Sequence, residues 1–190
     1  SFIASFFIKD GTQLSRFGAI VVAPVVEEIT KGLFLLITIT NKRFDNITDG
    51  IVYGGAIGLG FGMTENFMYF VTYGETLQNW IMLVIIRSLF SGVMHCVSTA
   101  TLGAFLGIAK FKSSLKKFFY VVTGLAIAML IHSIWNFSLS FENIAPIGFL
   151  FMFVSLIIFI ATFAVSLHGE RKIIFTELRE ETEHGIIPES

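Results

Sequence analysis

The sequence predicts an all-α fold: a polytopic membrane helix bundle with about five transmembrane helices. Of the 190 residues, 54% are hydrophobic and 14% are charged, whereas soluble domains carry about 25% charged residues. The mean hydropathy is +0.79. The 22 phenylalanines suit a surface that faces the lipid bilayer. Several separate apolar segments also reach the roughly 20 residues that a helix needs to cross a bilayer.

We expect the five spans near residues 14–40, 49–73, 79–109, 117–139 and 145–168. The third is long enough to be tilted or broken. Residues 1–168 would form one transmembrane domain, followed by a polar, acidic cytosolic tail at 169–190, into which the last helix continues for a few turns. Thr48 or Asp49 is expected to cap the second helix. The chain begins with Ser and shows no basic segment with a cleavage site, so we expect no signal peptide and further helices upstream.

Basic residues alternate between the loops and predict the orientation of the helices. The second and fourth loops carry no Lys or Arg, whereas the other loops and the tail do: Lys42, Arg43, Lys110, Lys112, Lys116, Lys117, Arg171 and Lys172. By the positive-inside rule, the first and third loops and the C-terminus are cytoplasmic. The net charge of −1 and the lack of a basic block exclude a nucleic-acid partner.

The first span contains three charged residues in the segment Glu27-Glu28-Ile-Thr-Lys31. Each would cost about 2.5 to 3.5 kcal/mol at the centre of a bilayer, so such residues usually face a polar cavity or one another. One interpretation is a structural ion pair between Glu28 and Lys31, which are three positions apart on a helix. That interpretation leaves Glu27 unexplained and favours a functional site.

Polar residues in the next three spans are candidates for the same site. In the second span, Gly54, Gly58 and Gly62 form a stripe that would allow close approach of another helix and bring Glu65 and Asn66 to it. The third span contains Arg87, a counter-ion for Glu75 or for a site carboxylate, together with His95 and Thr99. In the fourth, His132 and Asn136 are four positions apart and share one helical face. Depth can be counted from the outer end of each helix at about 1.5 Å per residue. By this count, five candidate residues from the four spans fall within one band of about 10 Å: Glu27, Glu28, Glu65, His95 and His132.

These motifs resemble a known family. Glu27-Glu28-x-x-Lys31 is similar to the EExxK motif of the PrsW intramembrane proteases, in the wider CAAX-protease and bacteriocin-processing (CPBP or Abi) superfamily. The resemblance continues in the same order through three further blocks: Asp49-Gly50 to Glu65-Asn66 and Tyr69, His95-x-x-x-Thr99-Ala100, and His132-x-x-Trp135-Asn136. The blocks span residues 24 to 136.

The resemblance implies hydrolysis of a peptide bond in a membrane-anchored protein, such as site-1 cleavage of an anti-sigma factor, in a prokaryotic cytoplasmic membrane. Carried over, Glu27 or Glu28 would activate water and His132 and Asn136 would stabilise the oxyanion. His95 would orient water or substrate, and Lys31, Glu65, Asn66 and Thr99 would support them. A divalent metal such as zinc is possible, with Glu65, His95 and His132 as ligands.

Two other classes of function stay open at this stage. Intramembrane Glu, His and Lys also serve ion- or proton-coupled transporters, although the chain shows no inverted repeat between its halves. A non-catalytic immunity or binding protein of the membrane is the third possibility. Proton flux that depends on a substrate would favour the transporter, and loss of substrate cleavage in glutamate or histidine variants would favour the protease.

Overall fold

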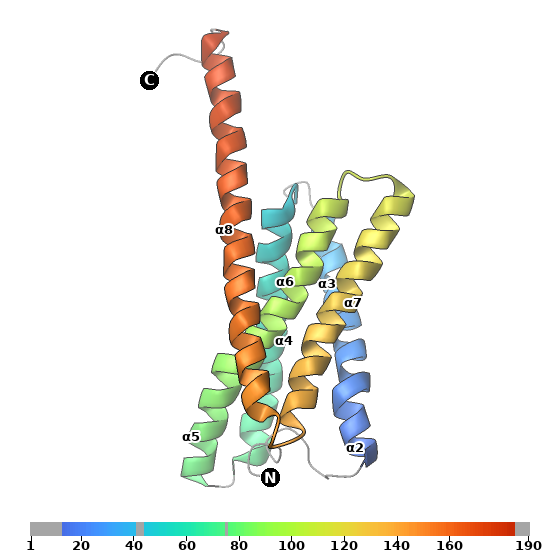
Figure 1. The fold of residues 1–190 in the computed structure, drawn as a ribbon, viewed down its shortest axis with the longest axis vertical. Coiled ribbons are helices and arrows are strands. Elements are labelled where there is room, and N and C mark those ends of the chain that lie inside the picture. Colours follow the sequence, from blue (N-terminus) through green and yellow to red (C-terminus); the bar gives the residue numbers. More distant parts are fainter. Residues whose placement is uncertain (1–12, 41–43, 75, 185–190) are drawn as a thin grey trace.

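The computed structural model describes residues 13–40, 44–74 and 76–184, and all the regular structure within them is helical. Five helical rods follow one another along the chain (Figure 1). The all-α membrane bundle expected from the sequence is thus confirmed. The rods are α2 (Gln13–Phe17), the π-helical turn η1 (Gly18–Val22) and α3 (Ala23–Ile39); α4 (Ile47–Tyr73); α5 (Leu77–Ile86), the π-helical turn η2 (Arg87–Ser91) and α6 (Gly92–Ala109); α7 (Ser114–Leu139); and α8 (Ala145–Glu183).

The helix ends lie close to those expected, and two features of the longer rods agree with the sequence analysis. The third rod is interrupted by η2, as its length suggested. The fifth runs past residue 168 as one helix to Glu183, so it continues into the polar tail. Figure 1 shows this extension of α8 rising beyond the other helices. Lys42 and Arg43 of the first expected loop lie outside the described residues.

Three of the described helices are long and apolar enough to cross a membrane: Leu77–Ala109, Ser114–Leu139 and Ala145–Glu183. The two remaining rods were also expected to be spans. The first contains Glu27, Glu28 and Lys31, and the second is rich in glycine, which lowers the hydropathy of both. Both rods nevertheless contribute polar residues to the interior of the bundle, where Glu28, Lys31 and Asn66 are fully buried.

The start of α4 corrects one expectation. Asn46, rather than Thr48 or Asp49, caps the helix, because its backbone is extended and its side chain accepts a hydrogen bond of 2.9 Å from the Asp49 N–H. The Asp49 carboxylate in turn accepts one of 2.7 Å from the Asp45 N–H. This reciprocal arrangement resembles a capping box. Thr48 instead pairs with Ser166 of α8, with 2.7 Å between the hydroxyl oxygens.

Glycines bring α4 and α6 into contact through their backbones, which confirms the expected stripe and identifies the neighbouring helix. A Cβ atom at Gly54 would lie 2.5 Å from the Thr99 carbonyl oxygen, and one at Gly58 would lie 2.1 Å from that of His95. A Cβ at Gly62 would lie 2.8 Å from the His95 ring. Larger residues would therefore push α4 and α6 apart, and the position of His95 depends directly on these glycines.

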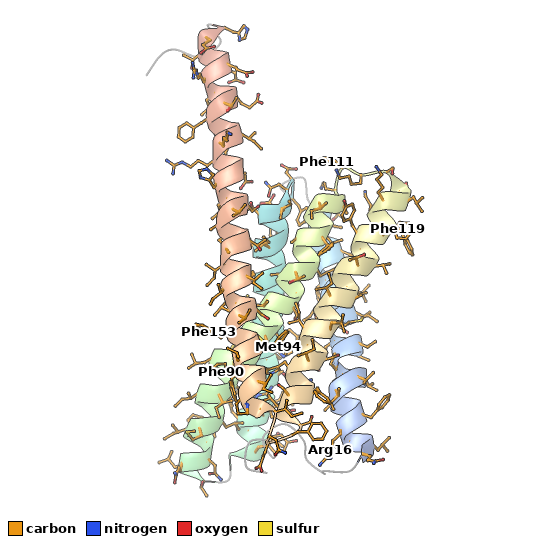
Figure 2. All side chains as sticks on the ribbon, in the orientation of Figure 1. Arg16, Phe90, Met94, Phe111, Phe119 and Phe153 are labelled. Carbon is orange, nitrogen blue, oxygen red and sulfur yellow. The ribbon has the colours of Figure 1, made fainter. Side chains whose placement is uncertain are left out.

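Helix α8 packs on the bundle mainly through its first turns. Trp135 of α7 is buried against Phe90 and Phe149, with ring centroids 6.3 and 5.4 Å away. Phe90 and Met94 lie where α6 approaches α8 (Figure 2). Trp135 is therefore a core residue of the bundle. Farther along α8, side chains project all round the helix in Figure 2.

Candidate active site

A polar cavity lies inside the bundle where the first, third and fourth rods meet the end of α4. Its volume is about 130 Å³, enough for several water molecules. Its lining consists of Ala19, Ala23, Glu27, Glu65, Tyr69, Arg87, Ser91, Met94, His95, His132, Trp135 and Asn136. Four separate helical rods thus contribute candidate residues to one space, as their similar depths in the sequence predicted.

Glu28 lies on the closed side of the two histidines, where its carboxylate is fully buried. Oε1 accepts a hydrogen bond of 3.0 Å from the Ser98 hydroxyl, and Oε2 accepts one of 3.3 Å from Thr99. Lys31 forms a buried ion pair with the same carboxylate. The expected Glu28–Lys31 pair is therefore present, and it neutralises a charge that would otherwise be costly to bury.

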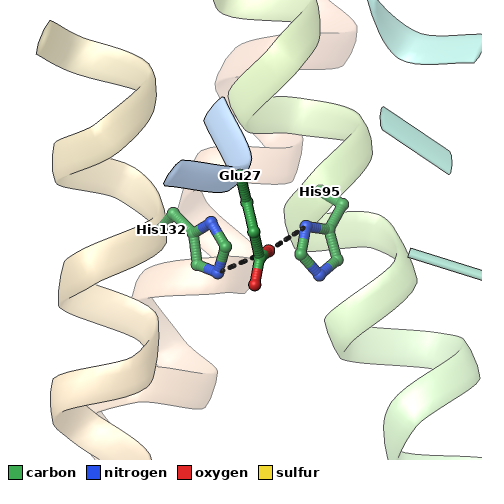
Figure 3. A group of neighbouring side chains, drawn as sticks. All are labelled: Glu27, His95 and His132. Carbon is green, nitrogen blue, oxygen red and sulfur yellow. Dashed lines mark ion pairs between the residues drawn. The ribbon is translucent and has the colours of Figure 1, made fainter. Parts of the chain in front are cut away.

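Glu27 faces the cavity and has very different surroundings. Its side chain is 19% exposed, yet its Oε2 atom is buried and has no hydrogen-bond partner among the described residues. This oxygen lies 4.0 Å from His95 Nδ1 and 3.8 Å from His132 Nε2 (Figure 3). A buried carboxylate oxygen without a partner is costly. The arrangement therefore leaves Glu27 available to a water molecule, a metal or a substrate.

His132 is oriented by Glu28. Its Nδ1 lies 3.0 Å from Glu28 Oε1, and because a carboxylate accepts, the ring donates its proton there. Its Nε2 is then the nitrogen with a free electron pair, and this atom faces Glu27.

His95 is oriented from both sides. Its Nε2 lies 3.0 Å from Glu65 Oε2, and its Nδ1 lies 3.0 Å from the Lys31 Nζ, which can act only as a donor. The proton therefore resides on Nε2, and Nδ1 carries the electron pair that accepts from Lys31. Two carboxylates thus fix the tautomers of the two histidines, and the unprotonated nitrogens both lie on the side of Glu27.

Glu65 is held by a second buried cation. Arg87 Nη2 lies 2.8 Å from Glu65 Oε2, and Arg87 Nε donates a hydrogen bond of 2.9 Å to Asn66 Oδ1. The guanidinium also lies over the Tyr69 ring, 3.5 Å from its centroid. Arg87 is therefore the counter-ion of a site carboxylate, one of the two roles expected for it; the alternative partner, Glu75, lies outside the described residues.

Two asparagines hold the two π-helical turns. The Asn136 side chain donates a hydrogen bond of 2.8 Å to the Ala19 carbonyl in η1. The Asn66 side chain donates one of 3.0 Å to the Arg87 carbonyl in η2. π-Helical turns are often found at functional sites. Both turns here line the cavity, so these two asparagines fix its walls.

The comparisons with known proteins agree with this geometry. Residues 2–165 match the model of the PrsW family intramembrane metalloprotease. The chain belongs to this family. Its membership rests on nearly the whole chain, including every residue that lines the cavity.

Individual PrsW relatives are moderately similar. The chain is 32% identical to Protease PrsW of Oceanobacillus iheyensis over 138 residues, 72% of this chain and 60% of that protein. It is 28% identical to that of Bacillus subtilis over 116 residues, 60% of this chain and 50% of that protein. For Clostridioides difficile the identity is 27% over 182 residues, 94% of this chain and 76% of the relative. The chain thus spans about half to three quarters of these relatives. No solved structure matches it.

The donor groups at the cavity fit a metal ion. Glu27, His95 and His132 can each offer one ligand atom, and these atoms lie within 4.8 Å of one another. Two imidazoles and one carboxylate are a common ligand set of catalytic zinc sites. Metal-binding histidines usually donate their other N–H to a carboxylate, as both do here. A metal bound to His95 Nδ1 would take the place of its Lys31 contact, and Lys31 would keep its pairing with Glu28.

The compact ligand group differs in one member from the set Glu65, His95 and His132 that the family resemblance implied. Glu27 lies between the two histidines, whereas Glu65 binds the far nitrogen of His95 and Arg87. Of the other expected residues, Thr99 and Lys31 contact Glu28, and Asn66 contacts Arg87. The sequence patterns did not single out Ser91, which lines the cavity, or Ser98, which binds Glu28. Ser98 follows His95 by three positions, a spacing that could have placed it on the same face.

Proposed function

We propose that this chain is an intramembrane endopeptidase that hydrolyses a peptide bond of a membrane-anchored protein. The observation that carries the proposal is the buried Glu27 oxygen, which has no partner among the described residues and lies between two oriented histidines. Membership of the PrsW family supports the reaction class.

Glu27 is the proposed proton carrier. It would accept a proton from the attacking water as the water oxygen bonds to the peptide carbonyl carbon. It would then pass that proton to the amide nitrogen as the C–N bond breaks. Such general acid–base catalysis is typically worth about 10²- to 10⁴-fold. Glu28 is unsuited to this role, because Lys31, Ser98, Thr99 and His132 already occupy its oxygens.

His95, His132 and Glu27 would hold a divalent metal such as zinc. Bound there, the ion would polarise the carbonyl and lower the pKa of a water molecule to about 7. A carboxylate has two oxygens, so one Glu27 oxygen can serve as a ligand while the other accepts a proton. Glu65 is instead proposed to orient His95, because its Oε2 already binds both His95 and Arg87.

Asn136 is proposed to contribute to oxyanion stabilisation. Its amide group carries two hydrogens, and one of them is used by the Ala19 carbonyl. The side chain lines the cavity, so the second hydrogen can donate to the oxygen on which negative charge develops. A donor that is fixed before the reaction stabilises that charge without reorganisation.

The substrate class and the orientation follow from the family resemblance and the loop charges. We propose a single-pass substrate of the anti-sigma-factor type, cleaved near its extracytoplasmic side in a prokaryotic cytoplasmic membrane. The last helix would end in the cytoplasm. The basic segment 110–117 and the extension of α8 lie at the same end of the bundle (Figure 1), which supports this orientation.

The test is cleavage of a membrane-anchored anti-sigma-factor peptide in liposomes by the wild type and by Glu27→Gln. We expect the wild type to cleave and the variant to lose at least 10²-fold in kcat/KM, because an amide cannot carry the proton. Thr101→Val, which removes a hydroxyl bonded to a helix carbonyl away from the cavity, should retain activity. Cleavage by Glu27→Gln at the wild-type rate would refute the proposal.

A further inference from the structure

Ser91 is a buried hydroxyl that the proposed chemistry does not use. Its residue is 2% exposed, it lines the same cavity as Glu27, and its Oγ atom has no hydrogen-bond partner among the described residues. Within those residues, the buried side-chain atoms without a partner are Ser91 Oγ and Glu27 Oε2. The two therefore belong to one space, and each lacks an interaction that a bound molecule can supply.

Many other helical hydroxyls in the described residues bond to the carbonyl three or four residues earlier, whereas those of Thr48 and Thr99 bond to side chains of other helices. Thr101 bonds to the carbonyl of Val97, at 2.8 Å, and Ser138 to that of Trp135, at 2.7 Å. The same pattern occurs in Thr30, Thr38, Thr64, Thr72, Ser98, Ser140, Thr162, Thr176 and Thr182. Ser91 departs from this pattern although it is also in a helix.

The π-helical turn η2 explains the difference. The carbonyl four residues before Ser91 belongs to Arg87, and it already accepts two hydrogen bonds. One comes from the Gly92 N–H across the π turn, and the other from the Asn66 side chain, at 3.0 Å. A carbonyl oxygen has two lone pairs, so this acceptor is saturated. The Ser91 hydroxyl does not bond to that carbonyl, and because it has no other hydrogen-bond partner among the described residues, it is left to the cavity.

We infer that Ser91 is a substrate-binding residue whose hydroxyl donates a hydrogen bond to a main-chain carbonyl of the peptide near the cleaved bond. This inference rests on the proposed function. A peptide strand that has left its helical conformation offers unpaired carbonyl groups, which need donors in a low-dielectric site. Arg87 and Lys31 are engaged with Glu65 and Glu28, so the neutral Ser91 supplies a donor that adds no charge.

The test measures binding of a peptide that comprises the transmembrane segment and extracytoplasmic flank of an anti-sigma factor. Glu27→Gln, which leaves the peptide uncut, is compared with Glu27→Gln/Ser91→Ala in detergent. We expect Ser91→Ala to weaken the Kd about tenfold, the value of one hydrogen bond in a dry site. Ser91→Thr, which keeps the hydroxyl, should restore binding. Thr101→Val, in the adjoining helix, should bind as the parent does.

Separate outcomes distinguish this inference from the proposed function. Equal binding by Glu27→Gln and Glu27→Gln/Ser91→Ala, including no binding by either, would overturn the role of Ser91. Cleavage of the same peptide by the wild type tests the protease activity independently. A peptide that binds with the expected dependence on Ser91 but is never cut would leave the binding role standing and refute the proposed reaction. A lower melting temperature shared by Ser91→Ala and Ser91→Thr would indicate a packing role and also overturn the inference.

Discussion

The two sides of the histidine pair are built from similar residues but differ in how fully those residues are paired. On the closed side, the buried Glu28 carboxylate accepts hydrogen bonds from three buried side chains: Lys31, Ser98 and Thr99. On the open side, Glu27 and Ser91 each have a buried oxygen atom without a partner in the described structure. The function of each carboxylate is therefore set by its partners. Glu28 orients a histidine, whereas its neighbour Glu27 remains available to react.

The largest effect is expected from removing the metal-binding groups of the open side. Wild-type protein should contain close to one zinc per chain by elemental analysis, and His95→Ala/His132→Ala should contain almost none, since two of three ligands are lost. Ser98→Ala, on the closed side, should retain zinc because the Ser98 hydroxyl bonds to the Glu28 carboxylate and to the main-chain carbonyl of His95, and not to the side chain of any ligand. Equal zinc content in wild type and double variant would contradict the assignment of the ligands.

A second contrast concerns folding stability. Glu28→Gln should lower the free energy of unfolding by about 3 to 5 kcal/mol, because it leaves Lys31 as an uncompensated buried charge. Glu27→Gln should change stability by less than about 1 kcal/mol, because the ion-pair contacts of Glu27 are long, 4.0 Å to His95 and 3.8 Å to His132, and its Oε2 has no hydrogen bond to lose among the described residues. Unfolding in mixed detergent micelles would measure both. Similar losses in the two variants would remove the distinction between the closed and open sides.

The smallest of these effects concerns the glycines of α4 that position His95, one of the two histidines between the closed and open sides. Gly58→Ala should destabilise the protein by about 1 to 3 kcal/mol, as expected of overpacking, because its Cβ would clash with the His95 carbonyl. Gly60→Ala is a matched control on the same helix, since nothing lies within 4 Å of a Cβ there. Thermal unfolding would separate them. Equal melting temperatures would mean that the contact between α4 and α6 is not tight.

Most of the fold could be predicted from the sequence, because apolar segments of membrane length leave few alternatives to helices. The glycine spacing in α4 indicated a close helix contact, and the similar depths of Glu27, Glu65, His95 and His132 indicated that they meet. These predictions depend on position along a helix axis, which residue counting gives directly.

The remaining features depend on rotation about the helix axes and on local irregularity, which counting does not give. Adjacent helical residues point about 100° apart, so Glu27 and Glu28 could not both face the cavity, and no local pattern decides between them. The π-helical turns, the saturation of the Arg87 carbonyl and hence the role of Ser91 arise from contacts with Asn66, 21 positions away. The Asn46 cap was missed because Thr48 and Asp49 are equally good cap residues by type.

The π-helical turn η2 also sets how the third rod responds to a change in its length. A π turn accommodates one residue more than an α-helical turn. Deleting a single residue between Arg87 and Ser91 would therefore let α5 and α6 join as one regular helix that keeps their relative rotation. Deleting a residue from the regular part of α6 would instead rotate the helix on one side of the deletion by about 100° relative to the other side. The third rod can thus lose one residue at this turn without turning α5 about its axis, and not elsewhere.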